Sequence, residues 1–158
     1  EKAVFIENKD MQPDLQGSEY VLERQLKPEA RKDIVEMFKK MDLKPTSMID
    51  ISDGLSSEIL HLSKASDLGL NLYEEKIPVD PSVMTLAEEF NLNGVTCALN
   101  GGEDYELLFT VRQKDYDLIK GNPHMTVIGY MLDKPSGENL ITHDGILMPL
   151  TAQGWKSH

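Results

Sequence analysis

The stretch from residue 48 to residue 62 reads MIDISDGLSSEILHL and predicts a short strand that turns directly into a helix. Its first half is apolar and rich in isoleucine, which is typical of a strand. In its second half apolar residues recur every three or four positions, which is typical of one helix face. At the changeover the chain places Asp50, Ser52 and Asp53 close together. Crowded carboxylates are costly unless a cation, a helix N-terminus or water compensates their charge.

The residues alone leave more than one role open for this turn. Asp53 stands where the N-cap of the helix belongs, and an N-cap carboxylate stabilises a helix by about 1 kcal/mol. Asp50 ends an apolar strand, where we expect a carboxylate to need a partner, and it shares a face with Ser52 if the strand extends that far. Such oxygen-rich clusters also favour hard cations such as Mg²⁺, which bridge carboxylates to phosphates.

A second acidic cluster, NGGEDYE at residues 100–106, leads into YELLFTV at residues 105–111, which we predict to be a strand. Its glycines are compatible with a plain turn, but they also let backbone N–H groups approach a substrate or a phosphate closely. Two carboxylates about 4 Å apart repel each other by roughly 4 kcal/mol at an effective dielectric constant near 20. A polyphosphate beside these clusters would therefore need Mg²⁺.

Helices and strands alternate along the rest of the chain, which favours an α+β fold, a layered domain with a mixed sheet flanked by helices. Residues 1–26 are mostly polar and are interpreted as a connecting segment, and residues 27–158 as the domain. We expect Pro28 and Glu29 to open the first helix. The other predicted elements are strands at residues 69–77 and 125–132, helices at residues 81–90 and 114–121, a loop or short helix at residues 93–102, and a hairpin in the tail.

Composition argues against several classes of function. The formal net charge of −11 argues against binding to nucleic acid, whose phosphates require clustered Lys and Arg. The sequence has no segment expected to cross a membrane. The single cysteine, Cys97, rules out an internal disulfide and fits a reducing, cytoplasmic location. The first residue is Glu1, so we expect a piece of a longer protein. Motifs for a Rossmann nucleotide site, a P-loop, a nucleophile elbow and a zinc cage are absent from the sequence.

The pair of motifs DISDGL at residues 50–55 and GGEDYELLFTV at residues 101–111 resembles the thiamine-monophosphate kinase family. That family is part of the aminoimidazole-ribonucleotide-synthetase-like superfamily, and the resemblance runs from about Glu1 to Trp155. It implies ATP-dependent phosphorylation of thiamine monophosphate to thiamine diphosphate by direct in-line transfer. It also implies that this chain is a C-terminal domain, that the N-terminal domain of the family is missing, and that the parent enzyme is a homodimer.

The resemblance also implies roles for individual residues. Asp50 and Asp53 match Mg²⁺ ligands, and Ser52 matches a contact to the phosphates of ATP. Glu103 matches a substrate contact, and Trp155 matches the aromatic residue that packs on the thiamine moiety. Phosphoryl transfer depends mainly on positioning and on neutralising charge, so no catalytic base is expected.

Other functions stay open at this stage. The chain is also compatible with a folded, non-catalytic binding module with an acidic surface, or with a related ATP-using enzyme of the same superfamily. A calcium-binding domain is a weaker alternative, because the sequence has no EF-hand spacing.

Overall fold

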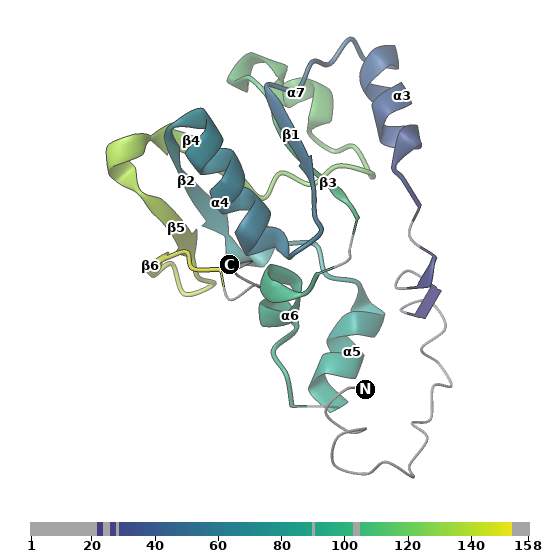
Figure 1. Ribbon diagram of the computed structural model, residues 1–158, viewed down its shortest axis with the longest axis vertical. Helices are drawn as coiled ribbons and strands as arrows, with labels where there is room; N and C mark the ends of the chain where they lie inside the picture. The colour runs from purple at the N-terminus through teal and green to yellow at the C-terminus, as the bar shows by residue number, and fades with distance from the viewer. Residues whose placement is uncertain (1–21, 24–25, 28, 90, 103–104, 153–158) are drawn as a thin grey trace.

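The computed structural model describes residues 22–23, 26–27, 29–89, 91–102 and 105–152 (Figure 1). In chain order its elements are α3 (Lys32–Lys40), β1 (Ser47–Asp50), α4 (Leu55–Ser66), β2 (Leu68–Tyr73), η1 (Glu74–Lys76), α5 (Pro81–Glu89), α6 (Gly94–Asn100), β3 (Leu107–Thr110), η2 (Gln113–Asp115), α7 (Tyr116–Ile119), β4 (Gly129–Asp133), η3 (Lys134–Ser136), β5 (Glu138–Ile141) and β6 (Leu147–Pro149). Among the described helices, none combines the length and the apolar composition that crossing a membrane requires.

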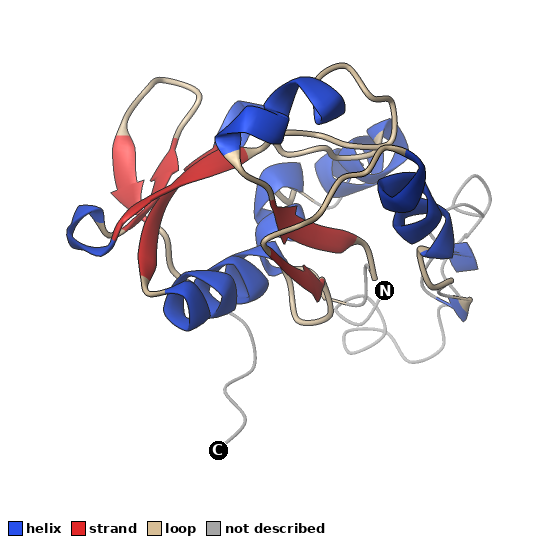
Figure 2. Ribbon diagram, turned by 90° about the horizontal axis from the view of Figure 1, so that it is seen from above, coloured by secondary structure: helices blue, strands red, loops and turns tan. Residues whose placement is uncertain are grey.

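The strands form two separate sheets, which Figure 2 shows side by side with helices around them. Four strands in the order β4-β2-β5-β6 make a mixed sheet, because β2 pairs with β5 in parallel and the other two pairings are antiparallel. Among the described residues, β1 and β3 form a separate antiparallel pair. The α+β class with a mixed sheet is therefore confirmed, and the separate two-stranded sheet is an addition to it.

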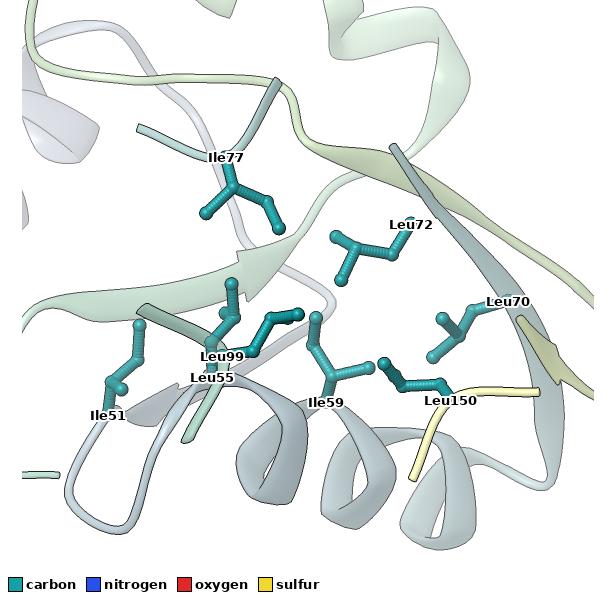
Figure 3. Packing of buried hydrophobic residues seen from close by; sticks show 8 residues of the cluster. All are labelled: Ile51, Leu55, Ile59, Leu70, Leu72, Ile77, Leu99 and Leu150. Atoms are coloured by element: carbon teal, nitrogen blue, oxygen red, sulfur yellow. The ribbon is translucent and has the colours of Figure 1, made fainter. Parts of the chain in front are cut away.

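Helix α4 lies against the mixed sheet and carries the larger hydrophobic core (Figure 3). Strand β2 alternates, so that Leu70 and Leu72 are buried under the helix while Asn71 between them is half-buried. Each fully buried aliphatic side chain contributes about 1.5–3 kcal/mol to folding. The buried members of this cluster are Ile51, Leu55, Ile59, Leu70, Leu72, Ile77, Leu99 and Leu150.

Strand β3 separates this core from a second one. The buried members of the second cluster are Ile34, Phe38, Leu43, Ile119 and Met125, contributed largely by α3 and the region around α7. Leu107 and Phe109 of β3 pack against this second cluster, whereas Leu108 between them packs against the first. Both faces of this short strand are thus in contact with apolar side chains, as alternation along a strand dictates.

The first helix starts later than the sequence predicts. Helix α3 begins at Lys32, so Glu29 lies outside it, and Pro28 falls outside the described residues. Arg31, just before the helix, donates to both carboxylate oxygens of Asp33 at 3.1 Å and pairs with Glu106. The hydrogen bond between Arg31 and Asp33 raises the pKa of the guanidinium and lowers the pKa of the carboxyl. The contact to Glu106 ties the start of the helix to the second motif.

Several other elements are also shorter than the sequence predicts. The helix expected over residues 114–121 is reduced to the single turn of α7 after η2, because Gly121 follows with φ +76° and Pro123 lies just beyond it. The strand expected over residues 125–132 is paired only from Gly129 onward, as β4. The strand expected over residues 69–77 ends at Tyr73, where η1 follows, and the one expected over residues 105–111 is β3, from Leu107 to Thr110. The expected helix at residues 81–90, the loop or short helix at residues 93–102 and the tail hairpin are present as α5, α6 and the β5–β6 pair.

The pairing of β1 with β3 brings the two acidic motifs together. The register sets Asp50 opposite Leu107, and the ladder continues beyond the strand ends, where Ile51 N donates to Glu106 O at 2.8 Å. Tyr105 N then donates to Ile51 O, also at 2.8 Å. Motifs about fifty residues apart in the sequence therefore lie next to each other in the fold.

Two glycines let the backbones of the motifs touch. Gly54 has φ +121°, and a Cβ atom there would lie 3.0 Å from the carbonyl oxygen of Leu99. A Cβ atom at Gly102 would lie 2.6 Å from the carbonyl oxygen of Ser52, closer than real Cβ atoms come. The turn after β1 and the loop after α6 are thus packed backbone against backbone, and a side chain at Gly102 has no room.

The far end of α4 is fixed to the mixed sheet by a polar link. Ser63 is fully buried, and its Oγ lies 2.5 Å from Leu68 O and 2.7 Å from Glu138 Oε1. Glu138 Oε1 also accepts a hydrogen bond from Lys134 Nζ at 2.6 Å. The hydrogen bond from Lys134, and next the one from Ser63, lower the pKa of the Glu138 carboxyl. The carboxylate of Glu138 therefore favours the folded state over the unfolded one.

The lowered pKa of Glu138 predicts a pH-dependent effect of Glu138→Gln. The contribution is complete above the pKa of an unfolded glutamate, about 4.3, and is lost as the pH falls through the lower pKa of the folded state. We expect Glu138→Gln to lower Tm by roughly 1–4 °C at pH 7 and to lose this effect in strong acid. Thermal unfolding of both proteins between pH 7 and pH 2 measures it, with the exposed Glu89→Gln as control. A difference in Tm that is the same at all pH values would contradict the link.

The contact at Gly102 predicts a second stability effect. Gly102→Ala should destabilise the fold by about 1–3 kcal/mol, because its methyl group would meet the backbone of Ser52. Gly145→Ala is the matched control: Gly145 has φ +77° and nothing within 4 Å of its Cβ position, so it reports backbone strain of about 1–2 kcal/mol alone. Urea unfolding gives both values. In NMR spectra only Gly102→Ala should shift the amide signals of Ser52 and Asp53, and unchanged signals would refute the contact.

Candidate functional site

The turn after β1 presents its polar side chains at the surface. Asp50 and Asp53 are exposed, and Ser52 between them is half-buried. Among contacts between described residues, neither aspartate carboxylate makes a hydrogen bond or an ion pair. The expectation that Asp50 needs a partner is wrong, because its carboxylate is exposed to water. The condition for a face shared with Ser52 is not met either, since β1 ends at Asp50.

The N-cap role considered for Asp53 is also wrong. The N-cap of α4 is Gly54, with φ 121° and ψ 150°, and no side chain caps it. This conformation is open to glycine and strained for other residues, and it inserts one residue between Asp53 and the helix. The side chain of Asp53 therefore does not cap the helix, so capping would not compete with a ligand for its carboxylate.

The turn is held from inside by Glu58, which the sequence analysis did not identify. Glu58 is only 2% exposed, and its Oε1 accepts hydrogen bonds from Asp53 N at 3.0 Å, Ser52 Oγ at 3.2 Å and Ser52 N at 3.4 Å. A signal was available, because Glu58 follows Leu55 by three positions and precedes Leu62 by four, which puts a carboxylate on the apolar face. A buried charge needs such partners.

The exposed donor set fits a hard cation. Two carboxylates with no other partner among the described residues, next to a hydroxyl group, are ligands of the kind that Mg²⁺ prefers. Within the described residues no group of three or more His, Cys, Asp and Glu side chains is close enough to hold a metal ion. An ion bound by Asp50 and Asp53 would have to complete its coordination with water, phosphate oxygens or groups from elsewhere, as Mg²⁺ commonly does.

The two remaining candidates, Glu103 and Trp155, lie outside the described residues. The residues on either side of the stretch with Glu103 are nevertheless fixed to the turn, since Gly102 packs against Ser52 and Tyr105 N donates to Ile51 O. Tyr105 has φ 54°, a left-handed conformation that is uncommon for a bulky residue and is often found at functional sites. Three predicted site residues, Asp50, Ser52 and Asp53, are thus brought together next to this stretch.

Two hollows on the described surface adjoin β1 and α4, the elements on either side of the turn. One hollow of about 510 Å³ lies between α3 and β1 and is lined by residues such as Phe38 and Met48. Another, of about 260 Å³, adjoins the first turn of α4 and includes Ser56 and Asn100 in its lining. Asp50 and Asp53 line neither of these two hollows. Phosphoryl transfer needs a site that excludes water, so these residues can form only part of such a site.

This chain is similar in sequence to known thiamine-monophosphate kinases. No protein-family model matches the chain. Curated relatives include the thiamine-monophosphate kinase of Aquifex aeolicus, 33% identical over 138 residues, which cover 86% of this chain and 40% of that protein. The thiamine-monophosphate kinase of Bacillus subtilis is 27% identical over 161 residues, which cover 97% of this chain and 47% of that protein. The chain therefore spans less than half the length of the curated relatives it matches.

This chain also resembles solved structures. A structure described as AaThiL complexed with AMPPCP and TMP matches with a TM-score of 0.74 and 29% identity, over 99% of this chain and 46% of that one. The hydrogenase maturation protein HypE of Escherichia coli matches with a TM-score of 0.62 over 78% of this chain, but at 17% identity this likeness concerns the fold alone. In sequence and in fold, this chain corresponds to one part of a thiamine-monophosphate kinase, somewhat less than half of such a protein.

Proposed function

We propose that this chain is the C-terminal domain of an ATP-dependent kinase that phosphorylates thiamine monophosphate to thiamine diphosphate. The observation that carries the proposal is the exposed turn with Asp50 and Asp53, whose carboxylates have no partner among the described residues. The backbone of the second motif packs against this turn and holds it in place. The proposal is supported by the relatives, since one of them was solved with AMPPCP, an ATP analogue, and TMP.

Each candidate residue has one proposed role in the reaction. Asp50 and Asp53 would hold Mg²⁺, which supplies the positive charge that phosphoryl transfer requires. Ser52 would lie beside the phosphates of ATP, while Glu103 and Trp155 would contact the acceptor. The rigid backbone contact at Gly102 keeps the turn fixed, so that little reorganisation is needed when ligands bind. The chain's own contribution is thus positioning rather than acid–base chemistry.

The exposure of Asp50 and Asp53 in the described part of the chain supports the view that a further domain completes the site. An N-terminal domain and a homodimeric parent enzyme, both implied by the resemblance, belong to this proposal, as does a cytoplasmic location. The chain spans only 40–47% of the relatives from Aquifex aeolicus and Bacillus subtilis, which leaves ample length for such a domain.

The first test of the function is the reaction itself. With ATP, Mg²⁺ and thiamine monophosphate, the intact enzyme should form thiamine diphosphate, whereas the 158-residue chain alone should form no more than a control without protein. Chromatography of the products measures both. No turnover by the intact enzyme would leave the non-catalytic binding module as the better explanation. Turnover by the chain alone would refute the requirement for another domain.

The second test concerns the proposed metal ligands in the intact enzyme. Asp50→Asn and Asp53→Asn should each leave the free energy of unfolding within about 0.5 kcal/mol of wild type, because both side chains are exposed and unpaired among the described residues. Turnover at limiting Mg²⁺ should fall about tenfold or more, and excess Mg²⁺ should restore part of it. The control is Asp42→Asn, since Asp42 is exposed, lies away from the turn and has φ 52°, which Asn tolerates. Wild-type Mg²⁺ dependence in both variants would exclude these residues as metal ligands.

A further inference from the structure

We propose that Glu58 is the positioning residue of this site. Through one carboxylate oxygen it fixes the Ser52–Asp53 turn and decides which way the hydroxyl group of Ser52 donates its proton. The proposal deepens the function proposed above and rests on it. Glu58 does not reach the reacting groups itself, because it is 2% exposed, and it acts through the residues that it holds.

The geometry concentrates three donors on one atom. Glu58 Oε1 accepts from Asp53 N at 3.0 Å, from Ser52 Oγ at 3.2 Å and from Ser52 N at 3.4 Å. Hydrogen bonds to an ionised group are roughly twice as strong as neutral ones. The acceptor reaches backward from the first turn of α4 past the N-cap at Gly54, so turn and helix are held as one body.

The three hydrogen bonds to Glu58 all go to Oε1, and its second oxygen, Oε2, takes part in none of them. Glu58 Oε2 is buried and finds no hydrogen-bond donor among the described residues. A buried carboxylate oxygen without a donor is unfavourable, so the three bonds to Oε1 are what the described part of the chain offers in compensation. Replacing Glu58 with leucine would therefore break the bonds to the turn without breaking any described bond at Oε2.

The hydrogen bond from Ser52 determines what this hydroxyl group offers to a ligand. A hydroxyl group has one proton, and here it is donated to Glu58. The oxygen then meets a ligand with its lone pairs, so beside the phosphates of ATP this hydroxyl group would face the cation that accompanies them rather than donate to a phosphate oxygen. The amide protons of Ser52 and Asp53 are likewise engaged by Glu58. The turn therefore faces its ligand as a set of acceptors.

Two variants and one control test this role in the intact enzyme. Glu58→Leu removes the acceptor, whereas Glu58→Gln keeps a carbonyl oxygen that can take the place of Oε1. Ser63→Ala is the matched control, because Ser63 is a buried, hydrogen-bonded residue of the same helix but lies at its other end. Three quantities are measured: Tm, hydrogen exchange of the Ser52 and Asp53 amides, and kcat and KM as functions of Mg²⁺.

The expected results separate positioning from stability. In Glu58→Leu the two amides should exchange about tenfold faster or more, and kcat/KM at limiting Mg²⁺ should fall by a similar factor, since the lost bonds involve a charged group. Glu58→Gln should stay within about threefold of wild type in both quantities. Ser63→Ala should lower Tm but leave amide exchange at the turn and Mg²⁺ dependence unchanged.

The outcomes also separate this inference from the proposed function. If the wild-type enzyme does not phosphorylate thiamine monophosphate, the proposed function fails, while amide exchange still reports whether Glu58 holds the turn. If the wild type is active but Glu58→Leu behaves like Ser63→Ala, the positioning role alone is refuted. Should Glu58→Leu not fold, Glu58→Gln decides: loss of amide protection despite the retained acceptor would overturn the proposal.

Discussion

The direct contact between two stretches of backbone, the turn after β1 and the loop before β3, is the constraint on which the rest of the site depends. Peptide groups meet there with no side chain between them, because both closest positions are glycines. Backbone is less adjustable than side chains, so the contact fixes the relative position of the two motifs more firmly than packed side chains would. The short β1–β3 pairing then sets the register of this contact.

The buried face of helix α4 includes polar residues among its apolar ones. Its buried face contains Glu58 at one end and Ser63 at the other, each bonded to a different segment of the chain. Apolar burial is non-directional, whereas a buried hydrogen-bonded group has few acceptable positions. We interpret these two residues as markers that fix the helix in rotation and along its axis, while Leu55 and Ile59 supply the burial energy.

Much of the fold could be predicted from periodicity and turn chemistry, and the omissions have physical causes. The strand-to-helix changeover, the helix opened by Pro81 and the α+β class follow from local patterns. The separation of β1 and β3 from the larger sheet, and the late start of α3 at Lys32, depend on contacts between distant segments, which no local pattern reports.

The candidate site could likewise be predicted only in part. Asp50, Ser52 and Asp53 could be located because they stand out against an apolar background, but the capping role of Asp53 failed on one backbone angle at Gly54. Glu58 was missed because a lone charge within a helical pattern is normally assigned to the solvated face. The roles of Asp50, Ser52 and Asp53 as ligands stay predictions, and so do those of Glu103 and Trp155, which lie outside the described part of the chain.

Strand β3 has a consequence for how the domain comes apart. An isolated two-stranded ribbon is barely stable in water, so β1 and β3 persist through the apolar side chains that β3 sends into both cores. Such a strand has no independent route of local opening, because exposing it disrupts both clusters together. Ser52 and Asp53 lie beyond the paired residues of the β1–β3 ladder, so their amides can exchange by local opening while the strands beneath them stay paired. The surface turn is thereby anchored at its base to a strand that opens only when both cores open.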